Sequence, residues 1–309
     1  MPSARSFDEV SPFLWFTSKG PTTMTTILVT GATGQLGRLA IDSLLARGTA
    51  PGDVVALVRD PAKAADLADR GVQVRVGTFE DPASLDAALA GVDRVLFISG
   101  SEVGQRVAQH QNVIDAAVRA DVELVAYTSI VRADTSPLAL AAEHKVTEEA
   151  LAAAGLPTAL LRNSWYLENY TAQIPVQLEH GVVLGAAGEG RVSAATRADY
   201  AEAAAAVITA DDQVGKVYEL GSDNAFTLGE YAAELSAAAN APVAYQDLSV
   251  ADYSAALVGA GLPEGYANVL ASSDDGLKQG GLLVETGDLS RLIGRPTTSL
   301  TQAIKAALV

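Results

Sequence analysis

Three glycines lie three residues apart in the stretch Gly31-Ala32-Thr33-Gly34-Gln35-Leu36-Gly37. An apolar, β-branched run precedes the stretch, and small or apolar residues at helical spacing follow it, so the pattern predicts a strand, a tight turn and a helix. In that setting Gly31 makes the turn, Gly34 admits a pyrophosphate close to the backbone, and Gly37 lets the helix pack on the strand. The N–H groups of the first helical turn then face the phosphates. We interpret the stretch as a dinucleotide-binding turn rather than a purely structural one.

The residue after the second apolar run, 54–58, indicates which dinucleotide is bound. Proteins that bind NAD commonly place Asp or Glu there to accept hydrogen bonds from the ribose hydroxyls, whereas this chain has Arg59. The planar guanidinium suits a 2′-phosphate, which favours NADPH over NADH as the cofactor, with NADH as a weaker alternative. Two other interpretations remain open: Arg59 begins a solvated loop, or the neighbouring Asp60 serves an NAD site.

The rest of the first half of the chain alternates between predicted strands and helices. This alternation predicts βαβ units with right-handed crossovers and a parallel sheet. The fold class is therefore α/β, a Rossmann-type doubly wound parallel sheet. The predicted strands after 54–58 are 72–76, 94–98, 124–128 and 158–161, and the predicted helices are 61–68, 84–89, 103–119 and 138–154.

The pattern changes after residue 162, where the predicted strands become shorter. They are 182–184, 216–220 and 243–245, with helices at 200–208, 228–239, 250–259 and 299–308. We predict a disordered extension or tag over residues 1–23, an NADP-binding Rossmann domain over 24–162, and a smaller α/β substrate-binding region over 163–309. Because no linker rich in Pro, Gly or Ser separates them, the second region should pack directly on the first.

Ligands of parallel sheets bind outside the carboxyl ends of the strands, so the residues at those ends complete the expected cofactor site. One of them, Ser101, has an alternative interpretation as the cap of the helix that follows. The predicted cofactor-binding residues are Gly31, Thr33, Gly34, Gln35, Leu36, Gly37, Arg59, Thr78, Phe79, Ile98, Ser99, Gly100, Ser101, Thr128, Ser129, His144, Arg162 and Asn163.

The helix expected over 138–154 carries the first candidate for proton chemistry. Short-chain dehydrogenases usually have Tyr-x-x-x-Lys after the fifth strand, and this motif is missing. Glu143-His144-Lys145 stands in the helix instead. His144 would border the nicotinamide, and its ordinary pKa suits proton exchange near neutral pH. The alternative is a structural histidine paired with Glu148 at i+4, and Lys145 is open to the same doubt.

Aromatic and amide side chains follow the sixth predicted strand. A planar acceptor would stack on aromatic rings and accept hydrogen bonds from amide groups, so we assign the substrate site to Trp165, Tyr166, Asn169 and Tyr170. Core packing is the alternative for Trp165 and Tyr170. Farther on, Thr196 to Asp199 resembles a capping box ahead of an alanine-rich helix.

Composition excludes several classes of function. Lys and Arg total 21 against 37 Asp and Glu, and the net charge of −16 argues against a nucleic-acid partner. The absence of Cys excludes disulfides and thiolate sites, and the three scattered His indicate no metal site. No apolar run reaches the roughly 18 residues that span a membrane. No signal peptide is evident either. We expect a cytoplasmic protein without membrane or nucleic-acid partners, and leave a homodimer open.

Several unusual stretches together resemble one family. The longest is Leu161-Arg162-Asn163-Ser164-Trp165-Tyr166-Leu167-Glu168-Asn169-Tyr170. The chain resembles the bacterial type 2 NAD(P)H:quinone oxidoreductases, which are NmrA-like, atypical short-chain dehydrogenases related to triphenylmethane reductase. The likeness runs from about Met24 to the C-terminus and leaves 1–23 unmatched. The other matching stretches are 31–37, 58–63, 101–106, 133–138, 195–200 and 293–298.

The resemblance implies NADPH-dependent hydride transfer from the nicotinamide to a quinone, without flavin or metal. In isoflavone-reductase-like relatives a lysine stands where this chain has His144, counted back from Gly155-Leu156-Pro157. The departure suits a quinone, because water can supply protons to the hydroquinonate and positioning then matters more than a strong acid. The catalytic candidates are His144, Asn163 and Tyr166. The alternatives are a non-catalytic NAD(P) redox sensor of the NmrA type and a reductase of another planar, imine or carbonyl substrate.

Overall fold

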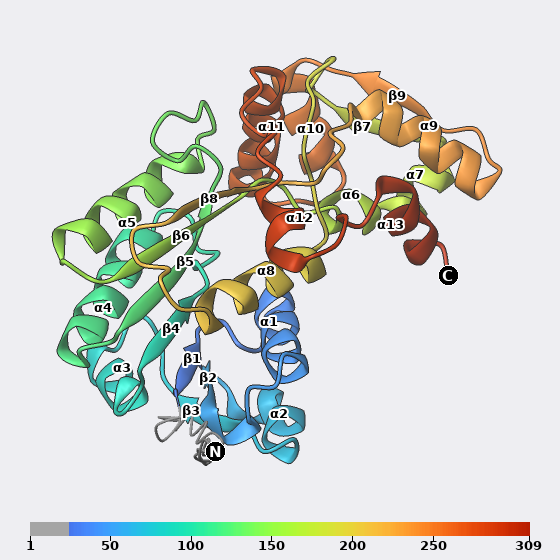
Figure 1. Ribbon diagram of the computed structural model, residues 1–309. Coiled ribbons are helices and arrows are strands. Elements are labelled where there is room, and N and C mark those ends of the chain that lie inside the picture. The colour runs from blue at the N-terminus through green and yellow to red at the C-terminus, as the bar shows by residue number, and fades with distance from the viewer. Residues whose placement is uncertain (1–24) are drawn as a thin grey trace, which may run out of the picture.

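The computed structural model describes residues 25–309 (Figure 1). Seven parallel strands form its main sheet in the order β3-β2-β1-β4-β5-β6-β8, which confirms the predicted doubly wound α/β class. The predicted extension over 1–23 lies outside the described residues. The strands are β1 (Ile27–Val29), β2 (Val54–Val58), β3 (Gln73–Val76), β4 (Arg94–Phe97), β5 (Leu124–Ile130), β6 (Thr158–Asn163) and β8 (Val217–Leu220).

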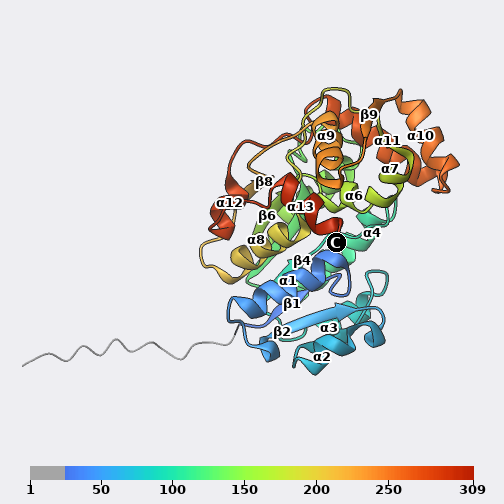
Figure 2. The ribbon, with the colours of Figure 1, turned by 90° about the vertical axis from the view of Figure 1, so that its right-hand side faces the viewer.

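Helices cover both faces of the sheet because successive strand residues point to opposite sides. In β1, Ile27 and Val29 join the core beneath α1 and α8, whereas Leu28 joins the core beneath α3, α4 and α5. Figure 2 shows α1 and α8 lying together on one face of the sheet. The first face carries α1 (Gln35–Ala46), α2 (Ala65–Asp69), α8 (Arg197–Thr209) and α12 (Asp288–Ile293), and the second carries α3 (Pro82–Leu89), α4 (Arg106–Arg119) and α5 (Ala141–Ala153).

A smaller α/β unit lies at one end of the sheet (Figure 1). Its two-stranded parallel sheet pairs β7 with β9, and a third apolar cluster that includes Phe226 and Tyr231 fills its interior. No helix within residues 25–309 is long and apolar enough to cross a membrane. The elements are α6 (Glu168–Thr171), α7 (Ile174–His180), β7 (Val182–Gly185), α9 (Leu228–Ala239), β9 (Ala244–Asp247), α10 (Val250–Gly259), α11 (Glu264–Lys278) and α13 (Leu300–Ala307).

Several element boundaries differ from the sequence prediction. The helix predicted from residue 103 begins only at Arg106 with Gln105 as its N-cap, so Ser101 is not a cap. The helix predicted over 61–68 consists of a 3₁₀ turn, Pro61–Ala64, followed by the short α2. Sequence analysis missed α11, whose Gly, Asn, Ser and Asp residues have low helix propensity. Strand β8 joins the main sheet from beyond residue 162, while the predicted division at that residue stays a prediction.

Hydroxyl side chains cap the two helices α13 and α8. Ser299 caps α13, and Gln302 completes a capping box there. Thr196 caps α8, since its hydroxyl accepts from the Asp199 N–H. The predicted capping box was wrong in one respect, because the buried Asp199 carboxylate does not accept from the backbone N–H of Thr196. It accepts from the backbone N–H and the hydroxyl of Thr298 instead, and so holds the C-terminal segment against α8.

Candidate active site

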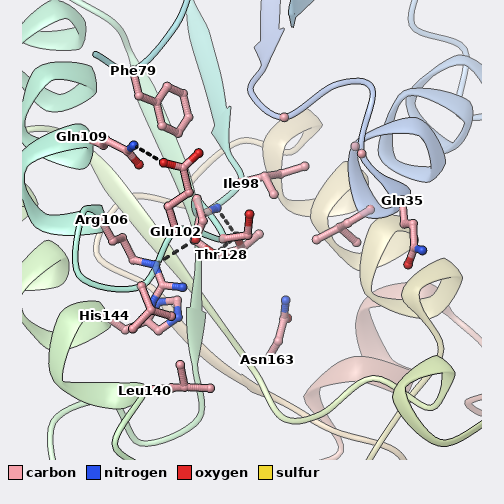
Figure 3. Close-up of a pocket in the computed structure, with 18 of the residues that line it drawn as sticks. Gln35, Phe79, Ile98, Glu102, Arg106, Gln109, Thr128, Leu140, His144 and Asn163 are labelled. Atoms are coloured by element: carbon pink, nitrogen blue, oxygen red, sulfur yellow. Dashed lines mark hydrogen bonds between the residues drawn. The ribbon is translucent and has the colours of Figure 1, made fainter. Parts of the chain in front are cut away.

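A cavity of about 770 Å³ opens at the carboxyl ends of the main strands (Figure 3). It runs from the glycine turn after β1 to the segment after β6, with one wall supplied by α11. The structure therefore brings most of the predicted residues to one place, but Arg162 and Tyr170 do not line the cavity. The predicted residues that line it are Gly31, Thr33, Gly34, Gln35, Leu36, Gly37, Arg59, Thr78, Phe79, Ile98, Ser99, Gly100, Ser101, Thr128, Ser129, His144, Asn163, Trp165, Tyr166 and Asn169.

The glycine turn leaves its backbone bare toward the cavity. Gly31 has a φ of +58°, which L side chains rarely adopt, and a Cβ on Gly37 would lie 2.2 Å from the Gly31 oxygen. A Cβ on Gly34 would meet only that same oxygen, at 3.1 Å. Gly34 is also the N-cap of α1 and provides no side-chain cap for the first-turn N–H groups. The residues that carry these donors line the cavity, and free N–H groups at a helix start suit a phosphate group.

Arg59, at the end of β2, lines the same cavity, and so does Lys63 in the 3₁₀ turn that follows. The Arg59 side chain is 76% exposed, and its guanidinium lies 3.3 Å from Glu102. Asp60, the alternative for an NAD site, does not line the cavity, and its carboxylate accepts from the Ala62 N–H at 3.0 Å. The arrangement thus favours Arg59 over Asp60 as the group that meets the ribose.

Loop 99–105, between β4 and α4, is held by buried side chains. The Gly100 N–H donates to His110 Nε2 at 2.9 Å, and Arg106 Nε donates to the Gly100 oxygen at 2.9 Å. Burial lowers the pKa of His110 to about 3, with the charge of Arg106 adding to the effect. Neutral His110 therefore carries its proton on Nδ1, which donates to Thr147 Oγ1 at 2.9 Å. Sequence analysis missed this role, because a lone histidine on a helix carries no signal of its partner.

His144 borders the cavity as a neutral group. It is 7% exposed, and burial lowers its pKa to about 3, with Arg106 and His110 contributing. Its Nδ1 lies 2.8 Å from the hydroxyl of Tyr127, whose pKa burial raises. We assign the Tyr127 hydroxyl as the donor to Nδ1, which places the imidazole proton on Nε2. The expectation of proton exchange near neutral pH does not fit this pKa.

The prediction that His144 pairs with Glu148 was wrong, because the Glu148 carboxylate binds other side chains. Its carboxylate accepts from Arg162 at 2.6 Å and from Ser129 Oγ at 2.6 Å. Arg162 also pairs with Glu219 at 2.9 Å and is nearly buried. Burial alone would lower the Arg162 pKa, but the hydrogen bonds to Glu148 and Glu219 outweigh it and raise the pKa. Arg162 thus supports the cavity floor through Glu148 and Ser129 without lining it.

Asn163 presents an unsatisfied amide at the cavity (Figure 3). The residue is 5% exposed, and its buried Oδ1 has no hydrogen-bond partner within residues 25–309. A buried acceptor without a partner is costly, so Oδ1 indicates a ligand that donates a hydrogen bond to it. His144 lies at the same end of the cavity, so two polar groups converge there.

Aromatic rings close this end of the cavity. Burial raises the pKa of Tyr166, and the Arg197 guanidinium lies 4.2 Å from the centre of its ring. Arg197 also donates to Asn169 Oδ1 at 3.0 Å, which fixes that amide beside the ring. Trp165 lines the cavity and packs against the apolar core of the smaller unit, so both of its interpretations apply.

Tyr170 belongs to that core instead of the cavity. Its ring packs against Phe226 and Tyr231 with centroid distances of 5.9 Å and 5.6 Å. The packing alternative therefore describes Tyr170 as the structure has it. In its place the missed helix α11 lines the cavity with Tyr266, Val269 and Leu270. Tyr266 is 58% exposed, so an aromatic face stands open at the mouth of the cavity.

Known proteins resemble this chain over most of its length. The sequence profile of the NmrA-like family matches residues 23–283. Quinone oxidoreductase 2 of Escherichia coli is 54% identical, over 90% of this chain and 97% of its own length. A solved NADPH-dependent quinone oxidoreductase from the same organism, in complex with NADPH, aligns with a TM-score of 0.90 at 52% identity, over 92% of this chain and all of that one. Triphenylmethane reductase from Citrobacter sp. aligns with a TM-score of 0.87 at 38% identity, over 92% of this chain and 99% of that one.

Proposed function

Because the chain belongs to the NmrA-like family, we propose that it is an NADPH-dependent reductase that transfers hydride directly to a quinone, without flavin or metal. One observation carries the proposal: a single cavity joins the bare glycine turn and Arg59 to the neutral His144 and the unsatisfied Asn163. The activity of the E. coli relative, at 54% identity, supports both the cofactor and the acceptor.

The cofactor half of the cavity is formed by the ends of β1 to β5. We assign the pyrophosphate to the Gly31–Gly37 turn and the N-terminus of α1, where N–H groups without a side-chain cap can bind an anion. Arg59 and Lys63 would hold the 2′-phosphate, and Thr78 and Phe79 would flank the adenine. Ile98 to Ser101, Thr128 and Ser129 would line the nicotinamide ribose. NADPH, when bound, supplies the hydride.

The acceptor half would position a quinone oxygen by hydrogen bonds from neutral donors. At a pKa of about 3, His144 holds no second proton near neutral pH, so its Nε2–H donates a hydrogen bond to the developing oxyanion without delivering a proton. The Asn163 Nδ2 group would add a second donor, whereas its unpartnered Oδ1 would accept a hydrogen bond from an N–H or O–H of the bound ligands. The hydride brings both electrons and one hydrogen to the quinone, and water supplies the one further proton that completes the hydroquinone.

Aromatic surfaces would orient the acceptor plane. Tyr166 is held in place by the guanidinium of Arg197, the neighbouring Trp165 lines the same cavity, and Tyr266 lines it from α11. Planar rings stack on such faces, so these residues select flat acceptors over flexible ones. We keep His144, Asn163 and Tyr166 as the catalytic candidates and replace Tyr170 by α11 in the substrate wall.

The test is an assay of NADPH oxidation with benzoquinone-type acceptors, repeated with NADH. We expect turnover with NADPH and weaker turnover with NADH. Tight NADPH binding without oxidation by any quinone would support the alternative, a non-catalytic redox sensor of the NmrA type.

A second candidate function is the reduction of larger planar dyes. The structural likeness to the triphenylmethane reductase and the open face of Tyr266 favour it. A cationic triphenylmethane dye offered in place of the quinone tests this candidate, since bleaching of the dye with NADPH oxidation would extend the acceptor range. If the dye keeps its colour and NADPH is not oxidised, the enzyme is limited to small quinones.

Three further expectations belong to the same proposal. We place the enzyme in the cytoplasm, without a nucleic-acid partner, since its net charge of −16 opposes binding to phosphate backbones. We keep residues 24–162 as the NADP-binding domain and 163–309 as the substrate-binding region. A homodimer is the oligomer to test, by the mass of the native protein in solution.

A further inference from the structure

An ion pair crosses the cofactor half of the cavity. Arg59 follows β2, and Glu102 lies in the loop between β4 and α4, with β1 between these strands in the sheet. The Arg59 guanidinium lies 3.3 Å from Glu102 Oε1, and both residues line the cavity. The pair therefore joins two loops over the end of β1, where the adenosine part of a dinucleotide lies in this fold.

The Glu102 carboxylate is held in this position by α4. Its Oε2 accepts from Gln109 Nε2 at 2.9 Å (Figure 3). The same nitrogen donates to Glu80 Oε1 at 2.6 Å. Gln109 is buried on α4, so its amide is a fixed point. Glu102 thus stays beside Arg59 whatever else Arg59 binds.

We propose that Glu102 sets the preference between NADPH and NADH by competing with the 2′-phosphate for Arg59. Before binding, the carboxylate occupies the guanidinium that the phosphate needs. After binding, the carboxylate remains nearby because Gln109 holds it, and it repels the phosphate. NADH has no 2′-phosphate and leaves the ion pair intact. The inference rests on the cofactor assignment of the proposed function.

The effect of removing the charge follows from the exposure of the pair. An exposed ion pair changes an equilibrium constant by about 1.4- to fivefold, and exposed like charges a few ångströms apart act on a similar scale. Glu102→Gln keeps an acceptor for Gln109 and removes only the charge. We expect the Kd of NADPH to fall by about three- to tenfold and the Kd of NADH to change by less than about twofold.

The experiment measures the Kd of NADPH and of NADH by nucleotide fluorescence without any acceptor. It compares the wild-type chain, Glu102→Gln, Arg59→Ala and the double variant. Asp86→Asn is the matched control, because Asp86 forms an exposed ion pair with Arg119 at 2.7 Å and does not line the cavity. In the Arg59→Ala background, Glu102→Gln should tighten NADPH less than it does in the wild type, since the competition is gone.

The outcomes separate this inference from the proposed function. A selective gain for NADPH that shrinks in the Arg59→Ala background supports the role of Glu102. Equal changes for both nucleotides, a weaker Kd for NADPH, or the same gain in Asp86→Asn would overturn it while leaving the cofactor assignment intact. A folded wild-type chain that binds neither nucleotide would overturn the cofactor assignment itself.

Discussion

Two glycines of the same turn should respond to alanine in opposite ways. A Cβ on Gly37 would lie 2.2 Å from the Gly31 oxygen and 2.8 Å from the Ala32 Cα, and both are backbone atoms that cannot rotate away. A Cβ on Gly34 would approach only the Gly31 oxygen, at 3.1 Å, and would otherwise stand in the cavity. Gly37→Ala therefore tests packing, and Gly34→Ala tests access to the cofactor.

The expected magnitudes differ accordingly. Overpacking against backbone costs up to about 3 kcal/mol, and alanine in a helix regains about 1 kcal/mol over glycine, so Gly37→Ala should lose about 2 kcal/mol of unfolding free energy. Gly34→Ala should stay within about 0.5 kcal/mol of the wild type, since Gly34 has an ordinary negative φ of −76°. Its methyl group occupies the path of the pyrophosphate, so the Kd of NADPH should rise by about tenfold or more.

Urea unfolding without nucleotide gives the stabilities, and NADPH fluorescence titration gives the Kd values. The account of the turn is refuted by Gly34→Ala protein that is folded and binds NADPH as tightly as the wild type. An unchanged stability of Gly37→Ala would likewise show that the helix does not need this close approach.

Three further predictions concern buried polar groups. The pKa of His144 is lowered from 6.5 to about 3, so the unfolded chain binds its proton first and stability falls as the pH falls from about 6.5 towards 3, by at most about 1.4 kcal/mol per pH unit. Burial raises the pKa of Asp274 to about 6, so this residue acts in the opposite direction between pH 4 and 6. The test is therefore to compare urea unfolding of His144→Asn and of the wild type across this pH range. If the unfolding free energies of the two proteins change with pH in parallel, the assignment to His144 is disproved. Tyr127→Phe removes the group that sets the His144 tautomer and should lower kcat by about five- to tenfold with the KM for NADPH unchanged, whereas a rise in KM alone would indicate a structural role. Arg162→Ala leaves Glu148 and its neighbours without their cation and should cost about 3–5 kcal/mol in urea unfolding, and a loss under about 1 kcal/mol would show that the cluster is solvated.

The sequence predicted the parts of the site that depend on local pattern. The glycine turn, the buried strands and Arg59 all follow from spacing and from the rule that ligands lie at the carboxyl ends of parallel strands. In the main sheet β5 and β6 were predicted two residues short, and β6 continues through the polar Arg162 and Asn163. The periodicity of apolar residues cannot mark such an end.

The rest depends on contacts between segments that are distant in sequence. Glu148 lies at the right spacing to pair with His144, yet the fold brings Arg162 to it. Tyr170 and Trp165 are five residues apart and equally aromatic, but only tertiary packing decides that Tyr170 lies against Tyr231. α11 was missed because its local propensity is low, so that packing in the smaller unit must stabilise it.

The most direct measurement is a single turnover of the purified chain with NADPH already bound and no flavin added. Benzoquinone mixed with this complex under anaerobic conditions should oxidise the nucleotide in one exponential phase. Deuterium at the transferred position of the nicotinamide should slow that phase, since the hydride passes directly to the quinone. Bound NADPH that survives the quinone, or that is oxidised only after flavin is added, would contradict the account.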